Sequence, residues 1–234
     1  MRPSSRTGSN PSTSVRTATL LLSGLLLGAI PALAQSDAVA LGVKRSSGDI
    51  DVMGSKFRPV GLDYIQEAGY PQSTRLRIGY SDEALGVSFE CEDTQLSAAT
   101  PEDMADLSRE DVVIVRVWPP GSDRYFQLYA SPLQNKTAHW ISESGEERTK
   151  PEGFEEIRIT TRVIGEGSFG TPGTPNQQNI EGWSEMISIP FSVLGVDPPQ
   201  PGDRWRANFT RIDYDSGTAA IWQWREEPGE IEFQ

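Results

Sequence analysis

The chain is poor in the residues on which many enzymes and extracellular proteins depend. Its 234 residues include one cysteine, Cys91, and one histidine, His139. A single cysteine excludes an intrachain disulfide, and the period-two spacing of Cys91 with Val87 and Phe89 predicts a small core residue. A serine triad would have to use His139, and no G-x-S-x-G elbow accompanies any serine. No acidic pair lies in a recognisable hydrolase motif, so we expect no catalytic residues.

Basic side chains are also scarce. The chain has 21 lysines and arginines against 33 acidic residues, a formal net charge of −12 at pH 7. Such a surface repels phosphate backbones and anionic lipid headgroups, so nucleic acid and membrane surfaces are not expected as partners. No apolar run reaches the ~20 residues that span a bilayer, so no membrane span is expected.

The apolar run at 18–30 is typical of a secretory signal peptide, because Ala32-Leu33-Ala34 follows it with the small-x-small pattern of a cleavage site. We expect residues 1–34 to be removed before Gln35 and the mature protein to be periplasmic or extracellular. The leader holds three basic residues and no acid: Arg2, Arg6 and Arg16. Its removal leaves 18 basic against 33 acidic side chains, a net charge of −15.

Alternation of apolar and polar residues is the main structural signal. Leu76, Ile78 and Tyr80 share one face of a predicted strand, and after a turn at 81–83 the pattern resumes at 85–91. Further strands are predicted at 111–118, 124–130, 137–142, 155–163, 182–189, 204–213 and 218–223. The pattern predicts an all-β, two-sheet antiparallel β-sandwich, jelly-roll-like, with short helical excursions.

The remaining segments set the domain limits. Residues 35–55 are polar and rich in Gly and Ser, so we interpret them as a flexible lead-in to a single domain at 56–234, whose first edge strand is 57–62. The short helical excursions are expected within 94–110 and 190–195. The Gly- and Pro-rich stretch 165–179 is predicted to be a long loop on the rim.

Five segments, taken together and in order, resemble family 9-like carbohydrate-binding modules, which are related to DOMON-like sandwiches. The last two carry the patterns G-W-x(6)-P-F and P-G-D-x-W-x-x-N-x-x-R. The segments are 74–93, 110–113, 124–128, 182–191 and 201–211. The resemblance implies a non-catalytic β-sandwich that binds poly- or oligosaccharide, is associated with glycan degradation and accompanies glycoside hydrolases.

The resemblance also suggests where a sugar would bind. Trp222 and Trp224 are two apart, so they face the same side of an extended segment. The residues at 225–228 resemble the family's W-R-D-P loop, which presents a sugar-stacking tryptophan, so Trp224 is the main candidate. Trp183 and Trp205 are expected in the core, and Trp118 and Trp140 could serve either role. The candidate carbohydrate-binding set is Trp224, Trp222, Tyr129, Asn208 and Arg211.

Three positions depart from the family pattern. The family's second Trp and its sugar-contacting Glu fall on Ser108 and Ile114, and the Glu of its W-T-V-E-I-A-I-P stretch falls on Met186. This predicts that Arg211 lacks its customary carboxylate partner.

Other functions remain open from the sequence. Related modules bind structural calcium, for which Asp82, Glu92 and Asp93 are the candidates here. A haem-binding electron carrier of the DOMON type would use His139 with Met104 or Met186. The chain could also be an accessory component of a glycoside hydrolase system, or a sandwich interaction domain that has lost its sugar site.

Overall fold

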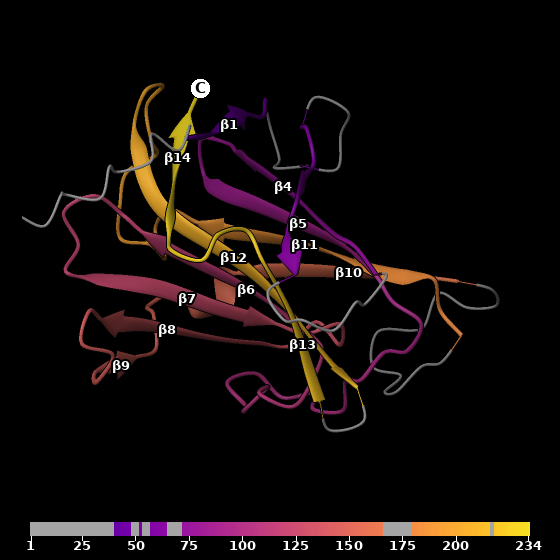
Figure 1. Cartoon of the computed structure of the whole chain (residues 1–234). Helices are drawn as coiled ribbons and strands as arrows, with labels where there is room; N and C mark the ends of the chain where they lie inside the picture. The colour runs from indigo at the N-terminus through magenta and orange to yellow at the C-terminus, as the bar shows by residue number, and fades with distance from the viewer. Residues whose placement is uncertain (1–39, 48–51, 53–56, 65–71, 166–178, 216–217) are drawn as a thin grey trace, which may run out of the picture. The chain divides into compact units, whose positions relative to one another are not determined.

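The computed structural model describes residues 40–47, 52, 57–64, 72–165, 179–215 and 218–234. They form an all-β sandwich of two sheets with fourteen strands, as predicted (Figure 1). The described part of the chain contains no helix with the length and apolar character needed to cross a bilayer. The predicted signal peptide and most of the predicted rim loop lie outside the described residues.

The first sheet is antiparallel along its main path, and its edge strand β10 follows a short 3-10 helix, η1 (Phe154–Glu156). Its strands, in spatial order, are β10 (Arg158–Ile164), β11 (Gly182–Pro190), β5 (Ala84–Glu92) and β4 (Thr74–Tyr80). The short β2 (Val60–Gly61) pairs with the free edge of β4.

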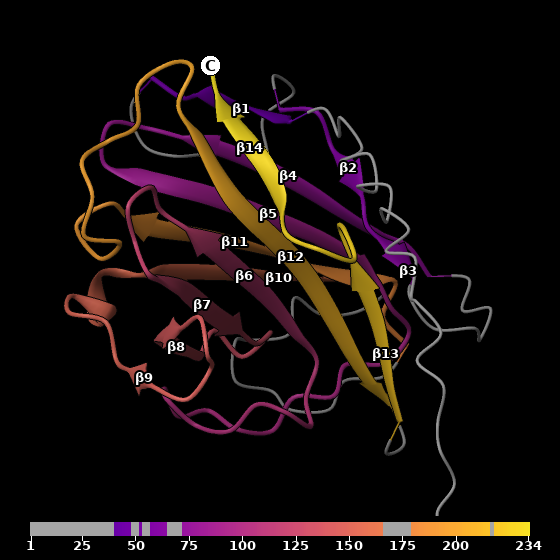
Figure 2. The same ribbon diagram turned by 60° about the vertical axis from the view of Figure 1, so that its left-hand side comes forward.

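The second sheet is built on the long strand β12 (Arg204–Asp215). On one side of β12 follow β6 (Val112–Trp118), β7 (Arg124–Ala130), β8 (Lys136–Ser142) and β9 (Arg148–Thr149). On its other side, β14 (Gly229–Phe233) pairs with its first half and β13 (Thr218–Gln223) with its second half, as Figure 2 shows. The short β3 (Asp63–Tyr64) pairs with β13.

Strand β1 (Leu41–Arg45) joins the two sheets. It runs parallel to β14, with Leu41 opposite Ile231, and parallel to β4, with Arg45 opposite Tyr80. The structure therefore corrects the interpretation of 35–55 as a flexible lead-in, because this part of it is a strand. Only Val43 of β1 is fully buried. Backbone pairing on both edges holds the strand, and an apolar pattern does not reveal such pairing.

Alternate residues of each strand point into the core between the two sheets, and the others point to the outer face of their own sheet. Leu76, Ile78 and Tyr80 are buried as predicted. Trp183 and Trp205 are 0% and 3% exposed, which confirms their assignment to the core. Cys91 is also in this core, where burial raises the pKa of its thiol, so it is the packed residue that the sequence predicts.

The predicted helical excursions are wrong. In the described residues η1 is the only helix, while 94–110 is irregular and 190–195 is a series of turns. Pro101 interrupts the first segment. Side chains hold much of its backbone: the N–H groups of Ser97 and Thr100 donate to the carboxylates of Asp111 and Glu110, at 2.7 and 2.9 Å.

Candidate functional site

The tryptophans predicted to stack on sugar share one side of the chain, but that side is the core. Trp222 is 2% exposed and its ring N–H donates to the carbonyl oxygen of Gln72 at 3.2 Å. Trp224 is 8% exposed, its ring centre lies 5.7 Å from that of Phe209, and the guanidinium of Arg225 lies 4.9 Å from it. The structure therefore gives both rings a packing role.

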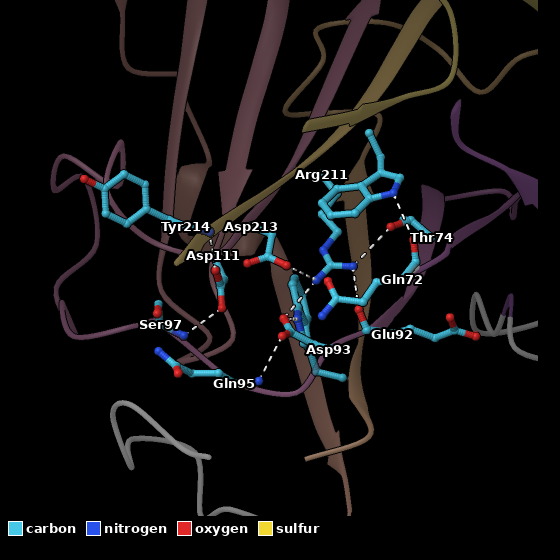
Figure 3. A network of polar contacts seen from close by, with 12 residues as sticks. Gln72, Thr74, Glu92, Asp93, Gln95, Ser97, Asp111, Arg211, Asp213 and Tyr214 are labelled. Atoms are coloured by element: carbon cyan, nitrogen blue, oxygen red, sulfur yellow. Dashed lines mark hydrogen bonds and ion pairs between the residues drawn. The ribbon is translucent and has the colours of Figure 1, made fainter. Parts of the chain in front are cut away.

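Arg211 lies at the centre of the buried network drawn in Figure 3. It is fully buried, and one terminal nitrogen lies 2.8 Å from Asp93 and 3.0 Å from Asp213. Its other terminal nitrogen donates to the carbonyl oxygen of Glu92 at 2.8 Å. The prediction that Arg211 lacks a carboxylate partner is wrong, because Asp93, beyond the end of β5, and Asp213, two residues along β12, supply two.

The family pattern expects a glutamate at position 186, where this chain has a methionine. The neighbouring glutamate, Glu185, points to the opposite face of the strand. Met186 faces the outer side of the first sheet, whereas its neighbour Glu185 faces the core and is 1% exposed. Neither carboxylate oxygen of Glu185 has a hydrogen-bond partner among the described residues. Burial raises the pKa of Glu185 well above its usual range, so the folded protein favours the neutral acid.

Another buried carboxylate, Asp111, lies beside the Arg211 network. Its two oxygens accept the backbone N–H groups of Ser97 and Tyr214, each at 2.7 Å. Burial and the neighbouring Asp93 raise the pKa of Asp111 to about 8. Each of Asp93, Asp111 and Asp213 offers an oxygen, and these oxygens lie within 4.8 Å of one another, a spacing that could suit a cation.

The donors around these carboxylates do not fit calcium. A guanidinium nitrogen of Arg211 already bridges Asp93 and Asp213, and Asp93 also accepts the ring N–H of Trp183 at 3.2 Å. Both oxygens of Asp111 are held by backbone N–H groups. Arginine thus supplies the positive charge that a cation would otherwise provide.

The three predicted calcium ligands are not brought together. Asp82 lies in the turn between β4 and β5, where it pairs with Arg45. Glu92 and Asp93 lie at the far end of β5, and the exposed carboxylate of Glu92 accepts the N–H of Ser73 at 2.9 Å. Only Asp93 belongs to the carboxylate cluster.

The outer face of the second sheet carries a row of side chains that crosses five strands. Trp118 and Tyr125 stack there with ring centres 4.7 Å apart and planes 28° apart, and the guanidinium of Arg206 lies 5.0 Å from the Trp118 ring. Cross-strand pairing continues the row through Ile141 to Arg148. Trp118 and Tyr125 are half-buried, so this aromatic pair reaches the surface.

A polar row lies next to it on the same face. Register places Asn208 opposite Arg116, Arg116 opposite Gln127, and Gln127 opposite His139. The Nε of Arg116 donates to the side-chain oxygen of Gln127 at 2.5 Å. Asn208 is buried and donates to the carbonyl oxygen of Arg225 at 3.0 Å. We call these two rows the open face.

Tyr129 belongs to a third row that the 94–110 segment covers. Leu107 packs with Ile114 in a small apolar cluster, against which Tyr129 lies. Thr137 donates its hydroxyl to the carbonyl oxygen of Ala105 at 2.6 Å, which fixes the segment to β8. The position of the family's glutamate is therefore under a loop, and Ile114 is 2% exposed.

Surface hollows also lie away from the open face, and two of them bear on the sequence-based predictions. One of about 350 Å³ lies between Ser108, its neighbours and Tyr214. The other, about 1100 Å³, lies on the outer side of the first sheet beside Met186 and is lined by five acids: Asp82, Glu83, Glu155, Glu156 and Asp197. No aromatic residue occupies an outward position on β4, β5, β10 or β11 in the described chain, so this face offers no ring for stacking.

The open face was largely missed from the sequence. From the sequence, Trp118 could have either a packing or a sugar-binding role. The sequence-based set of binding residues does not include Arg116, Tyr125, Gln127 or Arg206. A signal existed for Arg116, Tyr125 and Arg206, because each of them is next to a buried residue in an alternating pattern along β6, β7 or β12. Trp140, the other undecided tryptophan, is 8% exposed and packs edge-on to Phe126.

The haem alternative finds no support in the arrangement of His139 and the methionines. His139 faces the outer side of the second sheet and Met186 the outer side of the first, so the two cannot ligate one iron. Met104 packs against the main core, from which His139 points away. Burial and the nearby Arg148 lower the pKa of His139, so it is neutral at pH 7.

Comparison with known proteins supports the fold. No protein-family model matches the chain, and no curated protein matches it significantly. Among solved structures, a protein from Bacteroides uniformis, provisionally described as carbohydrate-binding, has a TM-score of 0.69 and 16% identity over 83% of this chain and 99% of its own.

Two further structures are of a carbohydrate binding module family 9 from Caldicellulosiruptor kristjanssonii, one in complex with cellotriose and one with glucose. Their TM-scores are 0.60 and 0.59, each with 15% identity over 83% of this chain, and they are covered over 93% and 95% of their own lengths. The described fold is thus that of a family 9-like module.

Proposed function

We propose that this chain is a secreted, non-catalytic carbohydrate-binding module that recognises poly- or oligosaccharide by aromatic stacking. The observation that carries the proposal is the stacked Trp118–Tyr125 pair beside Arg116 and Gln127 on the open face. The likeness in fold to modules crystallised with glucose and cellotriose supports it.

The chemistry of this face suits a sugar. A pyranose has C–H groups that pack against an aromatic ring and hydroxyls that need hydrogen-bond partners. Trp118 and Tyr125 supply the rings. Arg116 and His139 in the adjacent row supply donors and acceptors to hydroxyls at the edge of the sugar, and the buried Gln127 holds Arg116 in place.

The proposal includes export to the periplasm or the extracellular space. It also includes a role in glycan degradation together with a glycoside hydrolase. The apolar leader with its Ala-Leu-Ala site supports export. The family resemblance supports the association with glycan breakdown.

A glycan array on the purified protein tests the proposal, followed by titration calorimetry with the best ligand. We expect saturable binding that is lost in Tyr125→Ala and kept in Tyr214→Phe, a conservative change outside the open face. Absence of binding to every saccharide, with the protein folded, would contradict the proposal.

One observation favours a second candidate, an interaction domain that has lost the sugar site. The positions of the family's second tryptophan and glutamate are Ser108 and Ile114, and Ile114 is covered by Leu107. An empty glycan array would favour this candidate.

A further inference from the structure

The open face differs in charge from the rest of the chain. The protein has 33 acidic residues, yet no Asp or Glu occupies an outward position on the described strands β6, β7, β8 and β12. On the neighbouring β14, Glu230 lies opposite Arg206 and Glu232 opposite Arg204, and both acids pair with Arg204. Arg116 lies on β6 and Arg206 on β12, and β9 adds Arg148 at the end of the aromatic row. Cations therefore gather on the surface where a saccharide would stack.

These arginines also lack the carboxylate partners that neutralise others. Arg77 pairs with Glu90 on the first sheet, and Arg204, next to the open face, pairs with Glu230 and Glu232. No carboxylate among the described residues lies within ion-pairing distance of Arg116, Arg148 or Arg206. Arg116 instead bonds to the neutral Gln127.

Arginine is suited to acidic groups on a ligand. Its planar guanidinium presents paired N–H donors that match the two oxygens of a carboxylate or of a sulfate ester. Tyr125 stacks on the Trp118 ring and the guanidinium of Arg206 lies over it, so a sugar packed against the exposed edge of this tryptophan would have a guanidinium beside it. Arg116 is one row away on β6 and points in the same direction.

We infer that the saccharide bound by the open face is acidic, with its carboxylate or sulfate groups held by Arg116 and Arg206 beside the Trp118–Tyr125 pair. This inference rests on the proposed function and narrows its ligand class. A protein with a net charge of −12 repels anions at long range, so local cations are needed for an anionic ligand to bind. Ile141 is buried, so the continuous surface part of the aromatic row runs from Arg206 on β12 to Tyr125 on β7, two strand spacings or about 10 Å.

The test compares three oligosaccharides of equal length by titration calorimetry: a polyuronate, a sulfated neutral-backbone saccharide and an unmodified cello-oligosaccharide. We expect an acidic ligand to bind at least about tenfold more tightly than the unmodified one, with affinity that falls as salt is added. Preference between the two acidic ligands identifies the acidic group.

Arg206→Gln removes one exposed cation of the open face, and Arg116→Gln is the second variant. The matched control is Arg158→Gln, an equal charge change at an exposed position on the outer side of the first sheet. Both test variants should lose about tenfold in affinity for the acidic ligand, and the control should lose none. Melting temperatures verify that each variant is folded.

The outcomes separate this inference from the proposed function. If the unmodified saccharide binds as tightly as the acidic ones, or if Arg206→Gln and Arg158→Gln behave alike, the acidic-ligand inference is wrong while saccharide binding stands. If no saccharide of any of the three kinds binds to the folded protein, the proposed function fails as well.

Discussion

The guanidinium carbon of Arg211 lies 4.5 Å from the centre of the Trp222 ring, and neither side chain is more than 2% exposed. The tryptophan forms one wall of the arginine's pocket, while Asp93 and Asp213 neutralise its charge. Two residues predicted to contact sugar therefore contact each other inside the protein.

Replacing Arg211 should be strongly destabilising. Arg211→Met leaves the buried carboxylates of Asp93 and Asp213 without their cation, at a cost of about 3–5 kcal/mol in the free energy of unfolding. Urea denaturation measures this cost. The control is Arg204→Gln, which removes two exposed ion pairs and should change the stability little. Equal effects of the two variants would contradict a structural role for the network.

Glu185 should make the stability depend on pH. Its pKa is raised in the folded state by burial, so above the ordinary glutamate pKa the folded protein binds one more proton than the unfolded chain. The contribution of Glu185 to stability is therefore present at low pH and is lost as pH rises from about 4.5 toward its higher folded pKa. Asp111, with a pKa of about 8, acts in the same direction.

Glu185→Gln tests this dependence. The variant should flatten the decline of the unfolding free energy with pH by up to about 1.4 kcal/mol per pH unit, measured by urea denaturation from about pH 5 upward. Glu227→Gln, at an exposed position, is the matched control and should leave the slope unchanged. A slope that is the same in Glu185→Gln as in the parent would show that Glu185 does not stay neutral.

Trp118 and Trp224 should separate binding from packing. Trp118→Ala removes a half-exposed ring of the open face and should weaken glycan affinity about ten- to hundred-fold, or about 1–3 kcal/mol, with little loss of stability. Trp224→Ala leaves a cavity beside Phe209 and should cost about 3–5 kcal/mol of unfolding free energy, as should Trp205→Ala. Calorimetry and thermal melts are measured on all three. A stable Trp224→Ala variant that no longer binds glycan would restore Trp224 as the stacking residue.

Calcium should not stabilise this protein. Arg211 occupies the bridging position between Asp93 and Asp213, so the melting temperature is expected to be equal in excess calcium and in excess chelator. A calcium-dependent rise that disappears in Asp111→Asn would instead assign a cation to the carboxylate cluster.

Export predicts a defined mature end. Because the apolar leader closes with Ala-Leu-Ala, the intact mass of secreted material should correspond to a chain that begins at Gln35. Retention of Met1 in the secreted fraction would contradict this.

The fold could be predicted from the sequence because apolar and polar residues alternate along strands that have one buried face. The bounds of β7 and β13 agree with the predicted strands 124–130 and 218–223, and Leu76, Ile78 and Tyr80 face the core as expected. The strand β14 was missed because its buried residues, Ile231 and Phe233, follow Pro228-Gly229 too closely for a clear pattern.

The site was harder to predict from the sequence. Alternation with a period of two shows that residues share a face of the strand, but not whether that face is buried or exposed. Trp222 and Trp224 do share one, and it is buried. Asp213 is two residues from Arg211 on β12 and shares its face, whereas Asp93 follows the end of β5 in the other sheet, and no local pattern pairs it with Arg211. Only tertiary packing shows that Glu185, and not Met186, faces the core.

The position of β1 has a consequence for the order of folding. Its partner residue Ile231 lies 190 positions after Leu41, so the seam between the sheets closes only when the last strand of the chain is present. A contact between such distant segments forms late, because a long loop must first be closed. A chain that emerges from its N-terminus can therefore pair β1 with β4 early, but the β14 side of β1 stays unpaired until residues 229–233 have been made. The seam between the two sheets is thus one of the last parts of the sandwich to close.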